Sequence, residues 1–211
     1  MKIAIIGSGN IGSGLALTFG KTSNSVYLAS HNQAAAQEVA AKLEQQGVVV
    51  NAQSVVNAVA EAEVVFLAVP YDAVAELAKD VDFSGKIVVD VTNPVKADFS
   101  GISFGFDTSA AEEIQQLIAQ AKVVKGFNTV FAQIYQEGLQ FGEQQVQAFI
   151  ASDDEAAKDT VIALANEAGF EGVDAGALSN ARYLEPLAYL NIHFGYMLGK
   201  GTQIVPAWLS R

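Results

Sequence analysis

The fold follows from a short N-terminal stretch, which reads Met1-Lys2-Ile3-Ala4-Ile5-Ile6-Gly7-Ser8-Gly9-Asn10-Ile11-Gly12. An apolar run ends at the first glycine, and a helical pattern begins directly after the last. In such a strand, turn and helix, Gly7 permits a tight turn, Gly9 lets the backbone approach a pyrophosphate, and Gly12 lets the helix pack on the strand. The helix N-terminus adds unpaired N–H groups and partial positive charge. The stretch therefore predicts a dinucleotide site rather than a glycine-rich turn without a ligand.

Composition and charge narrow the class of protein. Hydrophobic residues make up 51% and charged residues 17% of the 211 residues, which is typical of a compact globular chain. The net charge is −11, so neither nucleic acid nor an anionic membrane is expected as a partner. There is no cysteine, which excludes disulfides, a thiolate nucleophile and thiolate metal sites.

Two further features of the sequence concern the cellular location of the protein. No apolar run approaches the roughly 18 residues of a membrane span. A strand that begins at Lys2 leaves no room for a signal peptide. We therefore expect a cytoplasmic protein.

Strand-like and helical patterns alternate through the first two thirds of the chain. The expected strands are 2–6, 25–29, 48–51, 63–69, 86–91 and 122–127. The expected helices are 11–20, 33–46, 54–60, 71–81 and 109–120. Continuous apolar strands separated by helices form parallel sheets that are covered on both faces. We expect an α/β fold with a doubly wound, Rossmann-type parallel sheet whose ligand lies at the carboxyl ends of the strands.

The last third of the chain has a different pattern. Expected strands at 145–151 and 171–174 flank an expected helix at 154–168, and a long apolar helix is expected at 179–198. A helix that is apolar nearly all round is buried, either under the sheet or against another subunit. We expect a dinucleotide-binding domain at 1–130 and a small α/β extension at 131–211. Part of the last helix is expected to form a homodimer contact.

The end of the second strand indicates which dinucleotide is bound. NAD-binding proteins of this fold carry a carboxylate there that accepts hydrogen bonds from the ribose, whereas this chain has Ser30-His31-Asn32. A carboxylate would repel a 2′-phosphate, but a hydroxyl, an imidazole and an amide can donate hydrogen bonds to one. These residues favour NADP over NAD. The alternative is that Ser30 and Asn32 only cap the next helix.

Three more strand ends carry unusual sequences at the edge where the nicotinamide belongs. They are Val69-Pro70-Tyr71, Asn93-Pro94 and Asn128-Thr129. Pro70 fixes its loop, and Tyr71 is placed to lie along the cofactor. The side chains of Asn93, Asn128 and Thr129 suit the carboxamide or a second substrate. Ordinary turn chemistry, in which Asn-Pro begins a turn, is the alternative.

Few other polar residues suggest chemistry. Arg182 opens the final helix and is available for an anionic group of the acceptor, or for an ion pair at the surface or between subunits. His193 lies in an apolar helix and is expected to pack rather than to act as an acid. The cluster at 153–155 suits a helix N-terminus rather than a metal, so no metal site is expected.

Taken in order, these residues resemble the coenzyme F420-dependent NADP oxidoreductase family. The likeness is carried by Gly7-Ser8-Gly9-Asn10-Ile11-Gly12, Ser30-His31, Ala68-Val69-Pro70, Phe127-Asn128-Thr129 and Asp174-Ala175-Gly176. The cytosolic reductase domains of the six-transmembrane metalloreductases are similar too, including the Phe-Asn-Thr stretch. The resemblance implies an enzyme that transfers a hydride between NADP(H) and a flavin or 5-deazaflavin, with the cofactors carrying the chemistry.

Two stretches differ from the F420-using members of that family. Those members have a positive pair where this chain has Ser30-His31-Asn32, and a His-Thr-Ile-Pro-like stretch in place of residues 128–131. The second stretch lies where the deazaflavin belongs, so a flavin, a quinone or another small molecule are alternative acceptors. A pyrroline-carboxylate reductase or a hydroxyacid dehydrogenase is an alternative enzyme, although these have a larger helical C-terminal domain. A non-catalytic NADP-sensing module is the alternative from another class.

Overall fold

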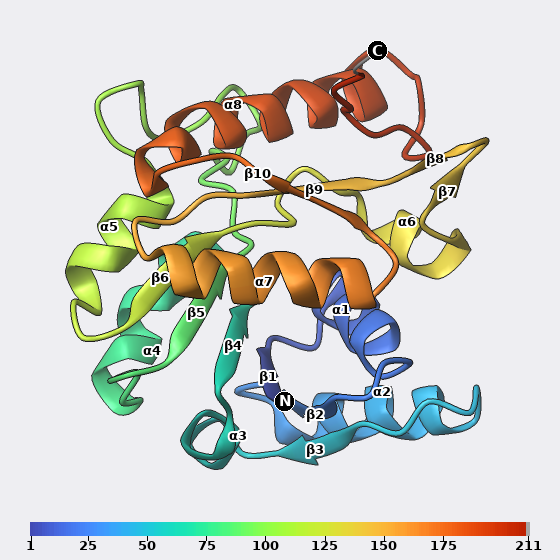
Figure 1. Ribbon diagram of the computed structural model, residues 1–211, viewed down its shortest axis with the longest axis vertical. Helices are drawn as coiled ribbons and strands as arrows, with labels where there is room; N and C mark the ends of the chain where they lie inside the picture. The colour runs from blue at the N-terminus through green and yellow to red at the C-terminus, as the bar shows by residue number, and fades with distance from the viewer. Residues whose placement is uncertain (210–211) are drawn as a thin grey trace.

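The computed structural model describes residues 1–209, and its centre is a parallel sheet with strand order β3-β2-β1-β4-β5-β6 (Figure 1). In chain order the strands are β1 (Lys2–Ile6), β2 (Ser25–Ala29), β3 (Asn51–Gln53), β4 (Val64–Leu67), β5 (Ile87–Asp90) and β6 (Lys122–Lys125). The strand order reverses between β1 and β4, the point at which such sheets bind ligands at their carboxyl ends. The expected doubly wound α/β sheet is confirmed.

Each face of the sheet buries its own hydrophobic core. In β1, Ile3 and Ile5 belong to one core. Ala4 and Ile6 belong to the other, because successive side chains of a strand point to opposite faces. The first face is covered by α1 (Asn10–Phe19), α2 (Gln33–Glu44) and α7 (Glu155–Glu167). The second is covered by α3 (Val55–Glu61), α4 (Val74–Asp80) and α5 (Ala110–Leu117). A short helical turn, η1 (Tyr71–Ala73), precedes α4.

The expected position of the third strand, 48–51, was wrong. Val48 and Val50 are buried, but they pack against Gly20 after α1 and do not pair with β2. Pairing begins only where Asn51 lies opposite Tyr27. Alternate buried valines give the same sequence pattern whether or not a ladder forms, so the pattern alone misplaced the strand.

The C-terminal part of the chain adds a second, smaller sheet beside β6. Its strands, β9 (Gln147–Ile150) and β10 (Glu171–Asp174), are parallel and are linked by α7. An isolated bridge between Lys125 and Ala151 joins this part to β6. Between β6 and β9 lie α6 (Ala132–Glu137) and a hairpin of β7 (Gln140–Phe141) and β8 (Gln144–Gln145). The final helix lies at the end of the molecule opposite β3 (Figure 1).

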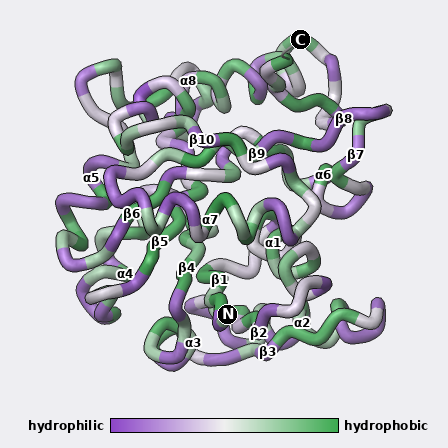
Figure 2. The backbone as a smooth tube through the Cα atoms, viewed as in Figure 1, coloured by the Kyte–Doolittle hydropathy of each residue, from purple (hydrophilic) through white to green (hydrophobic). Residues whose placement is uncertain are grey.

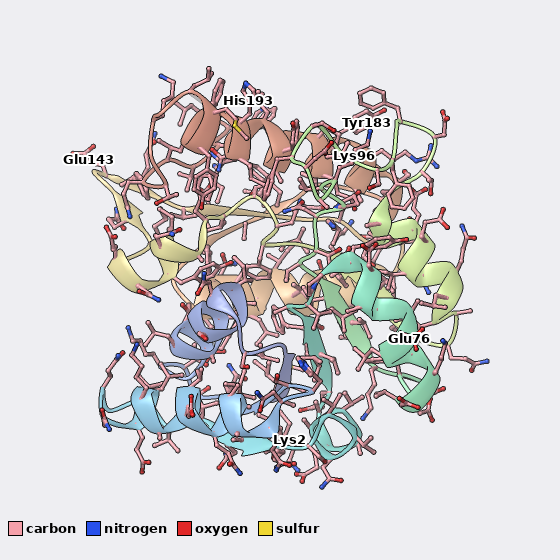
Figure 3. All side chains as sticks on the ribbon, turned by 180° about the vertical axis from the view of Figure 1, so that it is seen from behind. Lys2, Glu76, Lys96, Glu143, Tyr183 and His193 are labelled. Carbon is pink, nitrogen blue, oxygen red and sulfur yellow. The ribbon has the colours of Figure 1, made fainter. Side chains whose placement is uncertain are left out.

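The final helical segment is divided into three parts, whereas one continuous helix was expected at 179–198. It consists of the turn η2 (Leu178–Asn180), α8 (Ala181–Ile192) and a π-helical turn η3 (His193–Met197). Ala181 and Leu184 are buried, but Tyr183 and Leu190 are exposed. Figure 2 shows hydrophobic residues along α8, and Figure 3 shows the ring of Tyr183 pointing away from the body of the molecule. Only one face of α8 is therefore covered by this chain. None of the helices in residues 1–209 combines the length and apolar character needed to cross a membrane.

Candidate active site

The glycine loop between β1 and α1 has the geometry that its sequence predicts. Gly7 adopts φ of +118°, and a side chain there would overlap the Ala68 carbonyl. A side chain at Gly12 would overlap the carbonyl of Gly7. At Gly9, in contrast, an added methyl group meets no atom within 4 Å. Two glycines are thus required by the packing of the loop itself, whereas Gly9 leaves the loop open toward solvent.

The N-terminus of α1 lacks a capping side chain. Gly9 is its N-cap, and no acidic residue lies in its first turn. Side chains cap four other helices, namely α2 by Asn32, α3 by Ser54, α5 by Ser109 and α7 by Asp154. The amides at the start of α1 are therefore available to an anion, as the dinucleotide prediction requires.

A first cleft of about 460 Å³ opens beside this loop at the carboxyl ends of β1, β2 and β4. Gly7, Ser30, His31 and Val69 line it together with parts of α3 and α4. Ser30 accepts a hydrogen bond from the Asn32 amide, 3.3 Å. The Asn32 side-chain oxygen caps α2, so the capping role considered for this residue is confirmed. His31 is exposed, and neither lysine nor arginine lines this cleft.

The tips of β5 and β6 are tied together by an asparagine pair. Asn93 donates from its amide to the backbone oxygen of Asn128, 2.8 Å. Asn128 donates back to the side-chain oxygen of Asn93, 3.0 Å, and to the Leu184 carbonyl of α8, 3.1 Å. The Asn191 amide, also on α8, reaches the Thr129 carbonyl at 3.1 Å. The predicted strand tips therefore meet, and α8 fixes them.

A second cleft of about 280 Å³ lies on the other side of the glycine loop, over these tips. Its lining includes the predicted residues Asn10, Ile11, Asn93, Asn128 and Thr129. Sequence reasoning missed its other polar residues, Gln133, Asn191 and Tyr196, and its aromatic residues Phe99, Phe127 and Phe131. None of the residues that line this cleft carries a charge. Its walls are amides and flat apolar rings.

The elements β5, β6 and α8 also carry a buried group of three charged residues that the sequence did not reveal. The Lys125 ammonium contacts Asp90 at 2.8 Å, Glu185 at 2.9 Å and the Thr92 carbonyl at 2.7 Å. Lys125 and Asp90 are fully buried and Glu185 nearly so. Burial alone would lower the pKa of Lys125, but the two carboxylates raise it above its ordinary value, so the lysine stays charged.

Glu185 also connects two helices. Its carboxylate accepts hydrogen bonds from the amides of Ala110 at 3.0 Å and Ala111 at 3.2 Å, in the first turn of α5. A carboxylate at a helix N-terminus is stabilised by the helix dipole. The group formed by Asp90, Lys125 and Glu185, called the buried ion triad below, therefore joins β5, β6, α5 and α8.

The remaining predicted site residues have different positions. Arg182 forms an ion pair with Glu112 on α5, 2.7 Å, as the ion-pair alternative required. Hydrogen bonds from Arg182 lower the pKa of Glu112. Tyr71 packs edge-on against Phe104, 5.3 Å between ring centroids. Pro70 is exposed and directly precedes η1, whereas Pro94 is buried. In the glycine loop, the Ser8 carbonyl accepts a hydrogen bond from the Ser13 hydroxyl.

Two smaller predictions concern acidic residues and metals. Asp154 caps α7 through the Ala157 amide, 2.8 Å, as expected. Over residues 1–209, no group of three or more His, Asp or Glu side chains is arranged to hold a metal ion.

The comparisons with known proteins agree with this geometry. Residues 2–94 match the family model described as NADP oxidoreductase, coenzyme F420-dependent. The F420-dependent NADP reductase of Methanothermobacter marburgensis is 30% identical over 207 residues, which cover 92% of each chain. Metalloreductase STEAP3 of Rattus norvegicus is 33% identical over 189 residues. That match covers 88% of this chain but only 36% of the rat protein.

A solved structure extends the comparison to three dimensions. A protein of Arthrobacter sp. FB24, provisionally described as an F420-dependent NADP-reductase, superposes with a TM-score of 0.82. It is 26% identical, and the match covers 96% of both chains. The family can now be assigned. The match to the Methanothermobacter reductase covers 92% of each chain, and the glycine loop and the doubly wound sheet agree with it. The chain belongs to the coenzyme F420-dependent NADP oxidoreductase family, a family of NADP-dependent oxidoreductases.

Proposed function

We propose that this enzyme transfers a hydride between NADP(H) and a flavin-like or 5-deazaflavin acceptor. The observation that carries the proposal is the arrangement of two clefts on either side of the glycine loop, at one edge of the sheet. The uncapped start of α1 binds the pyrophosphate, and Ser30 and His31 in the first cleft donate to the 2′-phosphate. The nicotinamide then lies in the second cleft, beside Asn93.

The uncharged lining of the second cleft supports a neutral, flat acceptor. A carboxylate substrate needs a cationic or strongly donating partner when it is buried, and no arginine or lysine lines this cleft. This disfavours a hydroxyacid or a pyrroline carboxylate as the substrate. Aromatic rings and amides can hold and orient a flat heterocycle, and the nicotinamide supplies the hydride when it is bound.

The two parts of the chain have different tasks in this proposal. Residues 1–130 supply the whole lining of the first cleft and the strand tips of the second. Residues 131–211 contribute the opposite wall of the second cleft through α6, α8 and η3. We assign NADP(H) binding to the first part, and acceptor binding together with subunit contact to the second.

The direct test follows the absorbance of NADPH during steady-state turnover with a panel of flavins, a deazaflavin and quinones, and repeats it with NADH. We expect oxidation of NADPH by a flavin or deazaflavin, with a lower KM for NADPH than for NADH. NADPH binding without turnover by any acceptor would refute the proposal in favour of an NADP-sensing module. Turnover restricted to a keto acid or an imino acid would refute it in favour of a dehydrogenase.

Two glycine variants separate binding of the cofactor from folding. In Gly9→Ala the new methyl group meets no protein atom but occupies the space that a pyrophosphate approaches. We expect an unfolding midpoint close to that of the parent and NADPH binding weakened by at least about tenfold. In Gly12→Ala the methyl group overlaps the Gly7 carbonyl, so stability falls as well. Unchanged NADPH affinity in Gly9→Ala would show that this loop does not hold the cofactor.

We also propose that two copies of the chain associate through α8. A surface cavity of about 580 Å³ runs along the helix and is lined by Phe149, Tyr183, Leu187, Leu190 and Trp208, among other residues. Trp208 is 66% exposed and Tyr183 62% exposed. Contiguous exposed apolar surface of this kind marks an association site, and most soluble oligomers pair identical surfaces.

Sedimentation equilibrium tests this association. The parent is expected to be a dimer, and Leu190→Glu is expected to be a monomer. Val49→Glu is the matched control, because Val49 is an exposed apolar residue on the loop before β3. A monomeric parent at micromolar concentration would refute the dimer without affecting the proposed reaction.

A further inference from the structure

The buried ion triad contains one more carboxylate than its lysine can neutralise. Counted formally, the carboxylates of Asp90 and Glu185 contribute two negative charges and the ammonium of Lys125 contributes one positive charge. The amides of Ala110 and Ala111 offset part of the excess through the start of α5. The formal count of the three groups is nevertheless negative, in an interior where charges are ordinarily paired.

The triad adjoins the backbone of the second cleft's lining through the Thr92 carbonyl, which Lys125 contacts at 2.7 Å. Thr92, whose carbonyl contacts Lys125, precedes Asn93 of the cleft lining. Leu184, whose carbonyl holds Asn128, precedes Glu185. Asp90 is next to Val91 of the cleft lining, and Glu185 lies three residues before Ala188 of that lining. Both carboxylates are themselves buried. Screening by salt is weak for charges buried in this way.

We infer that the buried ion triad is an electrostatic positioning element that stabilises the oxidised, cationic nicotinamide relative to the reduced one. The inference rests on the proposed function, which places the nicotinamide in the second cleft. When NADPH reacts, the bond between C4 and its hydrogen breaks and both electrons leave with that hydrogen as a hydride. The acceptor ring gains the hydride, and the nicotinamide ring is left with a positive charge. A fixed negative charge behind the ring favours that change.

Neutralising one carboxylate removes this bias without leaving an unpaired charge. Glu185→Gln keeps the size of the side chain and one acceptor oxygen for α5, and it leaves Lys125 and Asp90 as a one-to-one pair. One unit charge acting over about 10 Å at an effective dielectric constant of about 20 corresponds to about a tenfold change in a binding ratio. The affinity for NADP⁺ relative to NADPH should fall by that factor. Asp90→Asn should change the ratio in the same direction.

The test measures dissociation constants for NADP⁺ and NADPH by isothermal titration calorimetry on the intact protein, with folding checked by circular dichroism. Glu112→Gln is the matched control. It breaks the ion pair with Arg182, which connects the same two helices, but at a partly exposed position away from the cleft lining. The expected result is a ratio changed about tenfold in Glu185→Gln and unchanged in Glu112→Gln.

The possible outcomes separate this inference from the proposed function. If both affinities change together in Glu185→Gln and in Asp90→Asn, the triad is only structural and the inference is overturned, while binding and turnover by the parent still support the proposed function. If one of the two variants does not fold, the ratio of the two dissociation constants in the other variant tests the inference. If the parent binds neither NADP⁺ nor NADPH, the proposed function and the inference are both overturned.

Discussion

Removing the cation of the buried ion triad should cost a large share of the stability of this protein. In Lys125→Met, the ion contacts to Asp90 at 2.8 Å and Glu185 at 2.9 Å and the hydrogen bond to Thr92 are lost. Two carboxylates are left buried without a counter-ion. Removing one partner of a buried ion pair destabilises proteins by about 3–5 kcal/mol, against a total of about 5–15 kcal/mol.

Urea denaturation followed by circular dichroism measures this loss. With a slope of about 2.5 kcal/mol per molar urea, a loss of about 4 kcal/mol lowers the midpoint by about 1.6 M. Lys79→Met is the control, because Lys79 pairs with Glu76 at the surface, where the side chains are 65% and 76% exposed. An exposed pair contributes about 0–1 kcal/mol, so the control midpoint should move by less than about 0.4 M.

A combined variant tests the reason for the loss. Lys125→Met with Asp90→Asn and Glu185→Gln removes every charge of the triad, so most of the stability should return. Equal midpoints for Lys125→Met and Lys79→Met would contradict this prediction, because they would mean that the triad is hydrated or not formed. A combined variant no more stable than Lys125→Met would show that hydrogen-bond geometry, and not charge, holds these elements together.

Three further predictions follow from single contacts. Ser30→Asp should weaken the binding of NADPH by about tenfold or more, because the new carboxylate repels the 2′-phosphate. Fluorescence titrations with NADPH and with NADH measure the two affinities. An equal loss of affinity for the two dinucleotides would argue against a 2′-phosphate site at Ser30. Hydrogen bonds from Arg182 lower the pKa of Glu112. The folded state therefore binds that proton less readily than the unfolded state. The stability difference between the parent and Glu112→Gln, about 1 kcal/mol, should be fully present at pH 7. It should decline as pH falls below the ordinary pKa of 4.5 and vanish only below the lowered pKa of the folded state, which urea denaturation at each pH can measure. The buried hydroxyl of Tyr135 has no hydrogen-bond partner, so Tyr135→Phe should raise the melting temperature by about 2–4 °C, and a lower one would indicate a bound water.

Local signals explain why the architecture was predictable. The glycine spacing, the apolar strands and the capping residues each act over a few neighbouring positions, so a linear pattern records them. Ser109 and Asp154 were placed correctly at helix starts for this reason. The strand at 48–51 failed because Val48 and Val50 are buried by α1 rather than by pairing. Alternating apolar residues predict that side chains are buried, but they do not identify the element that covers them.

The final helix shows the same limit. Its composition predicted burial either under the sheet or against another subunit, and this chain covers the face with Ala181 and Leu184. The sequence recorded how apolar the helix is, not whether the sheet or another molecule covers it. For Arg182 the sequence likewise left two roles, binding an anionic acceptor group or forming an ion pair. Its partner Glu112 lies 70 positions earlier, so only the folded structure shows the ion pair.

The α/β class, the position of the glycine loop and the lack of a carboxylate after β2 were all evident from the amino-acid order, because each depends on residues close together in the chain. The pairing of Asn93 with Asn128 and the position of Lys125 between Asp90 and Glu185 became evident only in the folded protein. The partners of Lys125 lie 35 and 60 positions away in the sequence. The residues next to Lys125 therefore do not indicate that it forms a buried ion pair. Such a pair forms only when packing removes water from both charges at once, and that depends on how the sheet and α8 come together.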